Sequence, residues 1–289
     1  MSDAQRVAIP MRPGERRVLR VFRTGFRVLS IVAPEWGGRL ACRLFTTPRR
    51  YTPPVFEAEI KAEGEALVLD HAGATLHGHR WGEGPTVLLI HGWEGRGAQL
   101  GHFVRPLVAA GYSVVAYDGP AHGKSDGKRT DGHHFATSLM TIAAAHGPVH
   151  GVVAHSFGGA ASQYALSLGF RPERLVLIGV PDRLSNVLHR FRAILRLPES
   201  IYSGALKHLG RRFEGDPRSV SFLGYDKGHH PPTLVIHDKG DREVPYSEGY
   251  ALYESLRYGE HMATEGLGHR RILKDSAVVR TAVEFITGG

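Results

Sequence analysis

Short apolar runs alternate with helical stretches from about residue 66 to the end of this chain. The runs are rich in β-branched residues and bounded by turn residues, so they predict buried strands joined by crossover helices. They read TVLLIHG (86–92), YSVVAYD (112–118), VHGVVAHS (149–156), RLVLIGV (174–180) and PTLVIHD (232–238), preceded by an opening hairpin in ALVLDH and TLHGHRW. The alternation predicts an α/β fold with a mainly parallel central sheet flanked by helices.

One interval breaks this rhythm. Residues 182–230 have a sequence pattern typical of helices and lie between two predicted strands. An insertion of that length is too long for a connecting loop. We therefore expect a core made of residues 58–181 and 231–289, with residues 182–230 as a helical lid inserted before the last long strand.

Residues 1–57 are expected to form a basic amphipathic arm. The first 50 positions hold eleven arginines and three acidic residues, an excess equal to the +8 of the whole chain. One helical stripe of the arm consists of Arg16, Arg20, Arg23 and Arg27, and the opposite stripe of Val18, Phe22, Phe26, Leu29 and Val32. Arginine recurs too often for a transmembrane span or a secretory signal. Two interpretations stay open: the apolar stripe packs on the body, or the helix lies on an anionic membrane surface.

The composition narrows the function classes. Cys42 is the only cysteine, so an intrachain disulfide is excluded and a reducing compartment is favoured. We expect a cytoplasmic protein, with membrane-peripheral contact of the arm left open. Apart from Phe45 and Tyr51, the basic clusters near residues 43–50 lack interleaved aromatic residues at a readable spacing, so no nucleic-acid partner is expected.

Metal and phosphate sites are not expected either. The pairs His133–His134 and His229–His230 are adjacent in sequence and have no carboxylate or cysteine to complete a ligand set. GPAHGKS is similar to a phosphate-binding loop, but Asp118 stands where that loop needs glycine. The sequence therefore predicts no metal and no cofactor, and it does not give the oligomeric state.

The run GVVAHSFGGAA (151–161) sets Ser156 where a strand ends and a small-residue helix begins. A nucleophile on such a sharp turn projects from the sheet, and the residues two before and two after it must be small. That requirement accounts for Ala154 and Gly158. The alternative is a buried serine that caps the helix.

On this motif the chain resembles the α/β-hydrolase superfamily, and most closely its bacterial esterase or monoacylglycerol-lipase-like serine hydrolases. The resemblance covers about residues 66–289, with Ala154 in place of the usual first glycine of G-x-S-x-G. It implies a nucleophile, an acid and a histidine in that chain order. LVIHDKGDREVP matches the family's pattern at Asp241, with Asp238 as the competing acid and Asp182 as a minor candidate. ATEGLGHRRIL matches the G-x-G-H loop at His269, whose alternative role is a helix cap.

The resemblance also implies an oxyanion hole made by the backbone N–H groups of Phe157 and Trp93. The loop IHGWEGRG carries the second of these, with His91 and Gly92 as structural supports. The substrate pocket is expected to include His155, Leu188 and Phe191, although the two lid residues serve equally well as core between the lid helices.

The function implied by these residues is hydrolysis of carboxylic esters, including lipid or monoacylglycerol-like esters, through an acyl-enzyme on Ser156. The partner is then a small-molecule ester. Two alternatives remain: an acyltransferase with the same triad, and a non-catalytic binding module on the same fold.

Overall fold

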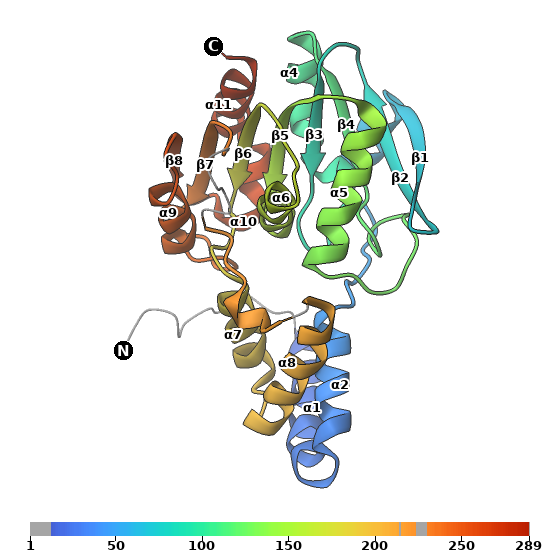
Figure 1. Cartoon of the computed structure of the whole chain (residues 1–289), viewed down its shortest axis with the longest axis vertical. Helices are drawn as coiled ribbons and strands as arrows, with labels where there is room; N and C mark the ends of the chain where they lie inside the picture. Colours follow the sequence, from blue (N-terminus) through green and yellow to red (C-terminus); the bar gives the residue numbers. More distant parts are fainter. Residues whose placement is uncertain (1–12, 214, 224–229, 289) are drawn as a thin grey trace. The chain divides into compact units, whose positions relative to one another are not determined.

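The computed structural model describes residues 13–213, 215–223 and 230–288. The first twelve residues of the expected arm and residues 224–229 of the expected lid, His229 included, lie outside these ranges. The chain divides into two compact units (Figure 1). A helical unit comprises the chain up to Thr47 together with Arg183–Ser221, and a sheet unit comprises Pro48–Asp182 and Phe222–Gly289.

The sheet unit is built on an eight-stranded sheet, counted over the described residues, in the order β1-β2-β4-β3-β5-β6-β7-β8. The pairs β1–β2 and β2–β4 are antiparallel, and every other neighbouring pair is parallel. The strands are β1 (Glu65–His71), β2 (Ala74–Trp81), β3 (Thr86–Ile90), β4 (Ser113–Tyr117), β5 (Val149–His155), β6 (Arg174–Ile178), β7 (Thr233–Asp238) and β8 (Gly259–Thr264). The predicted fold class is confirmed, because the β-branched runs are the buried inner strands that follow an opening hairpin.

Helices cover both faces of the sheet (Figure 1). One face carries α5 (Gly132–His146) and α6 (Phe157–Ser167), which contact each other, and the other carries η2 (Gly97–Phe103), α4 (Val104–Ala109) and α11 (Ser276–Thr287). A hydrophobic core between the sheet and the second group includes Leu89, Leu100, Phe103 and Ile286. Helix α9 (Tyr246–Glu254) packs on β7 and β8, and the short α10 (Gly268–Arg271) and η4 (Ile272–Lys274) lead into α11.

The sheet unit begins earlier than residue 58. Helix α3 (Val55–Ala62) belongs to it, because the indole N–H of Trp81 donates to the carbonyl of Ile60 at 2.7 Å. The guanidinium of Arg96 also forms a two-pronged, largely buried ion pair with Glu57. The sheet unit starts at Pro48, so α3 lies outside the helical unit.

The helical unit joins the arm to the lid. It contains α1 (Pro13–Val32), α2 (Pro34–Phe45), α7 (Leu184–Leu195), α8 (Glu199–Phe213) and the short η3 (Pro217–Ser219). Helices α2 and α8 approach closely because Gly38 and Gly204 face each other, and a Cβ on Gly38 would clash with the Gly204 backbone. The Arg23 guanidinium donates to the carbonyl of Ile194 near the end of α7, at 2.7 and 3.0 Å. The arm therefore packs on the lid helices. None of the described helices is long and apolar enough to cross a membrane.

Candidate active site

The turn after β5 holds Ser156 in a strained conformation. Ser156 has φ 51° and ψ −121°, a region that residues with a side chain rarely adopt, directly before the first residue of α6. Its N–H donates to the carbonyl of Ile178 on the neighbouring β6 at 2.9 Å, and its carbonyl accepts from Gly159 and Ala160. A Cβ at Gly158 would overlap the carbonyl oxygens of Ile90 and His91, so only glycine fits there. The residue two positions after Ser156 is therefore glycine for a steric reason.

Three side chains from separate loops form one hydrogen-bonded chain. The hydroxyl of Ser156 lies 3.0 Å from Nε2 of His269, and Nδ1 of His269 donates to Oδ2 of Asp241 at 2.7 Å. Ser156 follows β5, Asp241 follows β7, and His269 follows β8, so parallel strands bring all three to the same edge of the sheet. A Cβ on Gly179, after β6, would come within 3.5 Å of both the His269 ring and Asp241. The three residues proposed from the sequence are brought together.

The carboxylate of Asp241 is held in its charged form. Its side chain is only 1 % exposed. Burial opposes the charge, but hydrogen bonds from His237 and His269 and from the Val244 N–H hold the pKa of Asp241 well below its usual range. The other carboxylate oxygen accepts from the N–H groups of Glu243 and Val244 at 2.8 and 3.0 Å. Asp241 is therefore a fixed anion that aligns the imidazole of His269.

The competing acids occupy other positions. Asp238, at the end of β7, accepts from the N–H groups of Gly240 and Leu267 and from the hydroxyl of Thr264. These bonds connect β7 to β8 and to the loop before His269, which is a structural role. The carbonyl of Asp182 accepts from the N–H of Phe222 at 2.7 Å, and it is Asp241 that hydrogen-bonds Nδ1 of His269.

Two buried histidines lie directly behind this chain. Nε2 of His155 donates to the backbone carbonyl of His269 at 2.9 Å, and the two rings are 4.6 Å apart. His155 is 3 % exposed, and burial, reinforced by the nearby His269, holds its pKa well below its usual range. His155 is therefore a neutral support behind His269 and not a residue that faces substrate. Its expected place in the substrate pocket is corrected accordingly.

His237 was not singled out from the sequence. Its Nε2 donates to the carbonyl of Val244 at 3.1 Å and lies 3.5 Å from Oδ2 of Asp241, so it supports the acid as His155 supports the base. The only signal in the sequence is its position in β7, four residues before Asp241.

The loop after β3 is fixed by His91. Nε2 of His91 accepts from the N–H of Gly119 at 2.8 Å, and Nδ1 donates to the carbonyl of Gly92 at 2.7 Å. Both ring nitrogens are thus in use, as the expected structural role requires. Gly92 is small because a Cβ there would press on Ser156 and His155 at 3.0 Å.

The next residues form a tight turn that begins at Gly92. Its carbonyl accepts from the N–H of Gly95 at 3.0 Å, and Glu94 at the third position has φ 58°, whereas Trp93 is not among the residues with positive φ. This combination defines a type II turn, in which the N–H of Trp93 takes no part in the turn hydrogen bond. Phe157 is the first residue of α6, and its N–H has no acceptor within the helix. One expected backbone donor thus lies in the turn after Gly92, which approaches Ser156, and the other lies at the N-terminus of α6, directly after Ser156.

The side chains of Trp93 and Phe157 belong to an aromatic cluster. The Trp93 ring meets the Phe157 ring edge-on at 5.2 Å, and Phe135 packs edge-on against Phe157 at 5.1 Å. His122 contacts the Trp93 ring, and its Nε2 accepts from the N–H of Glu94 at 3.0 Å. Burial lowers the pKa of His122 from 6.5 to about 3, so this imidazole is neutral. Sequence analysis did not identify His122 or Phe135, which lie in a loop and in α5.

The two lid residues named from the sequence belong to the helical unit. Leu188 is buried there, and the Phe191 ring packs edge-on against Phe45 of α2 at 5.1 Å. Their observed contacts are those of a helix–helix core.

The remaining histidines singled out from the sequence make local contacts. The His133 ring lies near Tyr164, the His134 ring stacks on His71, and Nε2 of His230 lies 3.1 Å from the side chain of Gln163.

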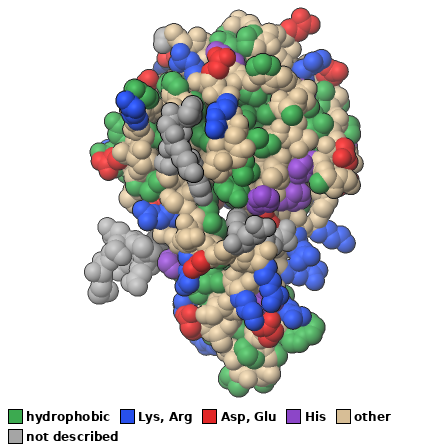
Figure 2. All heavy atoms as spheres, viewed as in Figure 1, with side chains coloured by type: hydrophobic (Ala, Val, Ile, Leu, Met, Phe, Trp, Pro, Cys, Tyr) green, Lys and Arg blue, Asp and Glu red, His purple; other side chains and the backbone are tan. Residues whose placement is uncertain are grey.

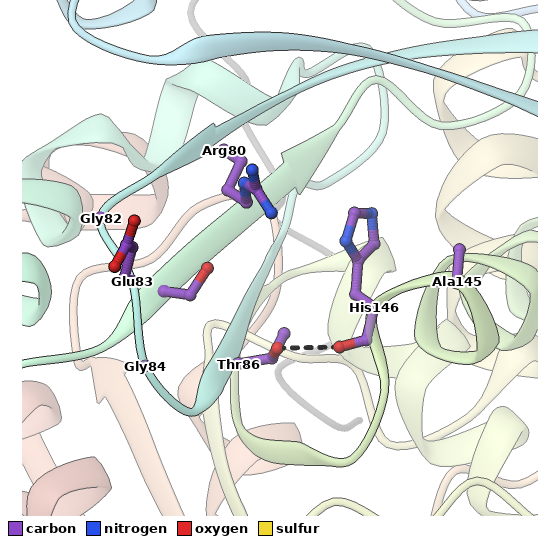
Figure 3. Close-up of a pocket in the computed structure, with 8 residues that line it drawn as sticks. Arg80, Gly82, Glu83, Gly84, Thr86, Ala145 and His146 are labelled. Carbon is purple, nitrogen blue, oxygen red and sulfur yellow. Dashed lines mark hydrogen bonds between the residues drawn. The ribbon is translucent and has the colours of Figure 1, made fainter.

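A depression of about 380 Å³ lies at the opposite edge of the sheet (Figure 3). Thr86 and Ser113, which line it, begin β3 and β4, whereas the triad follows strand ends. Arg80, Glu83 and His146 line the same depression, and the Thr86 hydroxyl donates to the carbonyl of His146 at 3.0 Å. No triad residue lines it.

Comparison with known proteins identifies the family of the chain. The model of the alpha/beta hydrolase family matches residues 87–282, which include the serine turn, the acid and the histidine. The chain belongs to the α/β hydrolase family. Within that family it is a hydrolase with serine at the strand-to-helix turn.

Two relatives are named as hydrolases of 2-hydroxy-6-oxo dicarboxylates. A 2-hydroxy-6-oxononadienedioate/2-hydroxy-6-oxononatrienedioate hydrolase of Dechloromonas aromatica is 36% identical over 67% of this chain and 84% of its own length. A hydrolase with the same named substrates from Klebsiella pneumoniae is 28% identical over 72% of this chain and 90% of its own length.

Among solved structures, an esterase of Pyrococcus furiosus superposes with a TM-score of 0.64 at 22% identity and covers 84% of this chain and 97% of its own. A meta-cleavage product hydrolase of Pseudomonas fluorescens has a TM-score of 0.58 at 20% identity and covers 77% of this chain and 97% of its own. These two likenesses establish the shared fold.

Proposed function

We propose that this α/β hydrolase cleaves carboxylic esters with Ser156 as nucleophile, His269 as base and acid, and Asp241 as the anion that orients His269. The observation that carries the proposal is the unbroken chain from the Ser156 hydroxyl through His269 to Asp241, at 3.0 and 2.7 Å. Hydroxyl, imidazole and carboxylate in this order are the parts that acyl transfer to serine needs.

The reaction proceeds in two halves. The Ser156 oxygen bonds to the carbonyl carbon of the ester while its proton passes to Nε2 of His269. The carbon–oxygen bond to the alcohol then breaks, and His269 returns the proton to the leaving alcohol. In the second half a water molecule attacks the acyl-enzyme, His269 takes the proton of that water, and the acid leaves as the hydroxyl of Ser156 re-forms.

The backbone N–H groups of Trp93 and Phe157 are proposed to stabilise the oxyanion of each tetrahedral intermediate. Phe157 supplies its donor at the N-terminus of α6, where the helix dipole also favours negative charge. Removal of one such donor typically raises the barrier by roughly 3 kcal/mol.

A second candidate is hydrolysis of a carbon–carbon bond next to a ketone, and the two relatives named above favour it. Those relatives act on dicarboxylates, as their names state, so a site of that kind needs cations for two carboxylates. Arg270 is the cation adjacent to His269, and it is engaged with Glu243 at 3.0 Å. We keep the ester as the first candidate because the triad by itself accounts for ester hydrolysis.

The proposal is tested by turnover of p-nitrophenyl esters of increasing acyl length, with a synthetic 2-hydroxy-6-oxodienoate as the carbon–carbon substrate and Ser156→Ala as the control for both. Ester turnover that is lost in Ser156→Ala, without loss of the dienoate chromophore, supports the ester hydrolase. Dienoate cleavage without ester turnover would replace it with the second candidate. An added alcohol acceptor that diverts the acyl group from water would indicate an acyltransferase.

A further inference from the structure

Helix α1 leaves half of its apolar side chains in solvent. Phe26 is buried in the helical unit, but Val18, Val21, Val28 and Val32 are exposed. With about 3.6 residues per turn, these four valines fall within roughly 80° of the helix circumference. They therefore form a second apolar stripe, separate from the face that packs on the lid helices.

At the end of this stripe the chain passes from α1 into α2 at Ala33 and Pro34. Three of the most exposed apolar side chains lie at this corner, with Ile31 83 %, Val32 70 % and Trp36 70 % exposed. We call Val28, Ile31, Val32 and Trp36 the corner patch. A tryptophan beside aliphatic side chains is typical of surfaces that enter the lipid headgroup region, because the indole has an apolar body and a polar N–H.

Arginines border the corner patch. Residues 16–47 contain seven arginines and one acidic residue, Glu35. Arg16, Arg20 and Arg27 are exposed and share one side of α1 next to the valine stripe, and Arg39 of α2 lies 5.8 Å from the Trp36 ring. Glu35 is 3.7 Å from Arg39, so its charge is already balanced. Figure 2 shows basic and hydrophobic side chains beside one another on this unit.

We propose that the corner patch and its arginines dock this protein on an anionic lipid bilayer, with Ile31, Val32 and Trp36 in the headgroup region. Apolar area and positive charge on the same face are what an interfacial helix needs, since each contributes separately to the binding. A second copy of the chain would bring the same arginines to the interface and repel them, so charge complementarity favours the lipid. The proposal is independent of the bond that Ser156 attacks.

The test is flotation of the full-length protein with vesicles of equal parts phosphatidylglycerol and phosphatidylcholine, and with vesicles of phosphatidylcholine alone. We expect the protein to float with the anionic vesicles. High salt should release it, because salt screens the attraction between the arginines and the anionic lipids. The variant Ile31→Gln/Val32→Gln/Trp36→Gln should lose at least about tenfold in partitioning. Arg20→Gln and Arg27→Gln should each lose roughly fivefold on anionic vesicles.

A matched control removes the same number of exposed apolar side chains from the sheet unit, as Val55→Gln/Val68→Gln/Leu168→Gln. This control should float like the natural protein. Circular dichroism of every variant establishes that it is folded, which separates lost docking from lost structure. The blue shift of Trp36 fluorescence on vesicle binding, absent from Trp36→Phe, supplies a second readout.

Two results would overturn the proposal. One is a natural protein that stays with the unbound fraction on anionic vesicles, or a triple Gln variant that floats as well as the natural protein. The other is a vesicle-free dimer that becomes monomeric in the triple variant, since the corner patch would then be a contact between two copies.

Discussion

Nε2 of His155 donates a hydrogen bond of 2.9 Å to the backbone carbonyl of His269, from a position directly behind the imidazole that contacts Ser156. His269 is thus held at its ring nitrogens by Ser156 and Asp241 and at its backbone carbonyl by His155. Buried polar supports of this kind keep a site rigid only while each group has its partner.

The first prediction concerns that support. His155→Leu should leave the carbonyl of His269 without a donor, with a loss of about 1–3 kcal/mol in the free energy of unfolding. A displacement of the imidazole by about 1 Å would lower kcat roughly 10²-fold. His155→Gln keeps a donor of similar reach and should retain most of both quantities. Urea unfolding and ester kinetics measure the two, and equal kcat in His155→Leu and the natural protein would contradict the role given to His155.

The second prediction separates the two acids. Asp241→Asn should lower kcat by roughly 10⁴, because an amide cannot hold His269 in the tautomer that accepts the serine proton. Asp238→Asn should instead reduce stability by about 1–3 kcal/mol, since its carboxylate bonds to Gly240, Thr264 and Leu267, and should leave kcat much closer to its natural value. Kinetics and urea unfolding of both variants provide the check. The reverse pattern would make Asp238 the acid.

The third prediction tests the backbone donor at Trp93. This residue stands second in a type II turn, the position that proline favours, so Trp93→Pro removes the N–H while the turn persists. Trp93→Ala is the matched control, because it removes the same ring and keeps the N–H. Relative to Trp93→Ala, we expect Trp93→Pro to lose about 10²–10³ in kcat. Equal kcat in the two variants would show that the oxyanion donor is elsewhere.

The fourth prediction concerns stability at mildly acidic pH. The pKa of His122 is about 3 in the folded chain and 6.5 when the side chain is unperturbed, so the unfolded chain binds an extra proton between these values. Stability is therefore complete above pH 6.5 and falls as the pH drops below it, by about 2 kcal/mol at pH 5 from this residue alone. The pKa of Asp241 is lowered from 3.8, so this residue adds a separate loss of stability only as the pH falls to about 3.8 and below.

His122→Gln isolates this effect, because glutamine can still accept from Glu94 and donate to Pro120 without titrating. Urea midpoints at pH 7.5 and 5 should fall less in His122→Gln than in the natural protein. Equal losses in the two proteins would mean that the pKa of His122 is the same in the folded and the unfolded chain.

The sheet was predictable because its information is local. Each inner strand is a short β-branched run whose side chains are buried on both faces, and Ser156 and Asp241 follow the ends of two such runs. His269 follows β8, which is only partly buried, and its signal in the sequence is the G-x-G-H loop. Ser156 was also marked locally, since Gly158 is small for a steric reason that operates within the turn and β3.

Other features were not predictable because they depend on contacts between distant segments. An apolar stripe on α1 does not specify its partner, and the contact of Arg23 with Ile194 spans 171 residues. His155 and His237 look in sequence like any other strand residues, and only the fold sets them behind His269 and Asp241. The same limitation applies to Val18 and Val32, which the sequence pattern grouped with Phe26 in one stripe but which are exposed.

The most direct measurement of the central claim is labelling of the full-length protein with a fluorophosphonate probe, followed by peptide mass mapping. We predict one modified residue, Ser156. Labelling should be abolished in Ser156→Ala and strongly slowed in His269→Ala. Absence of labelling in folded protein, or labelling that persists in Ser156→Ala, would contradict a serine nucleophile at this turn.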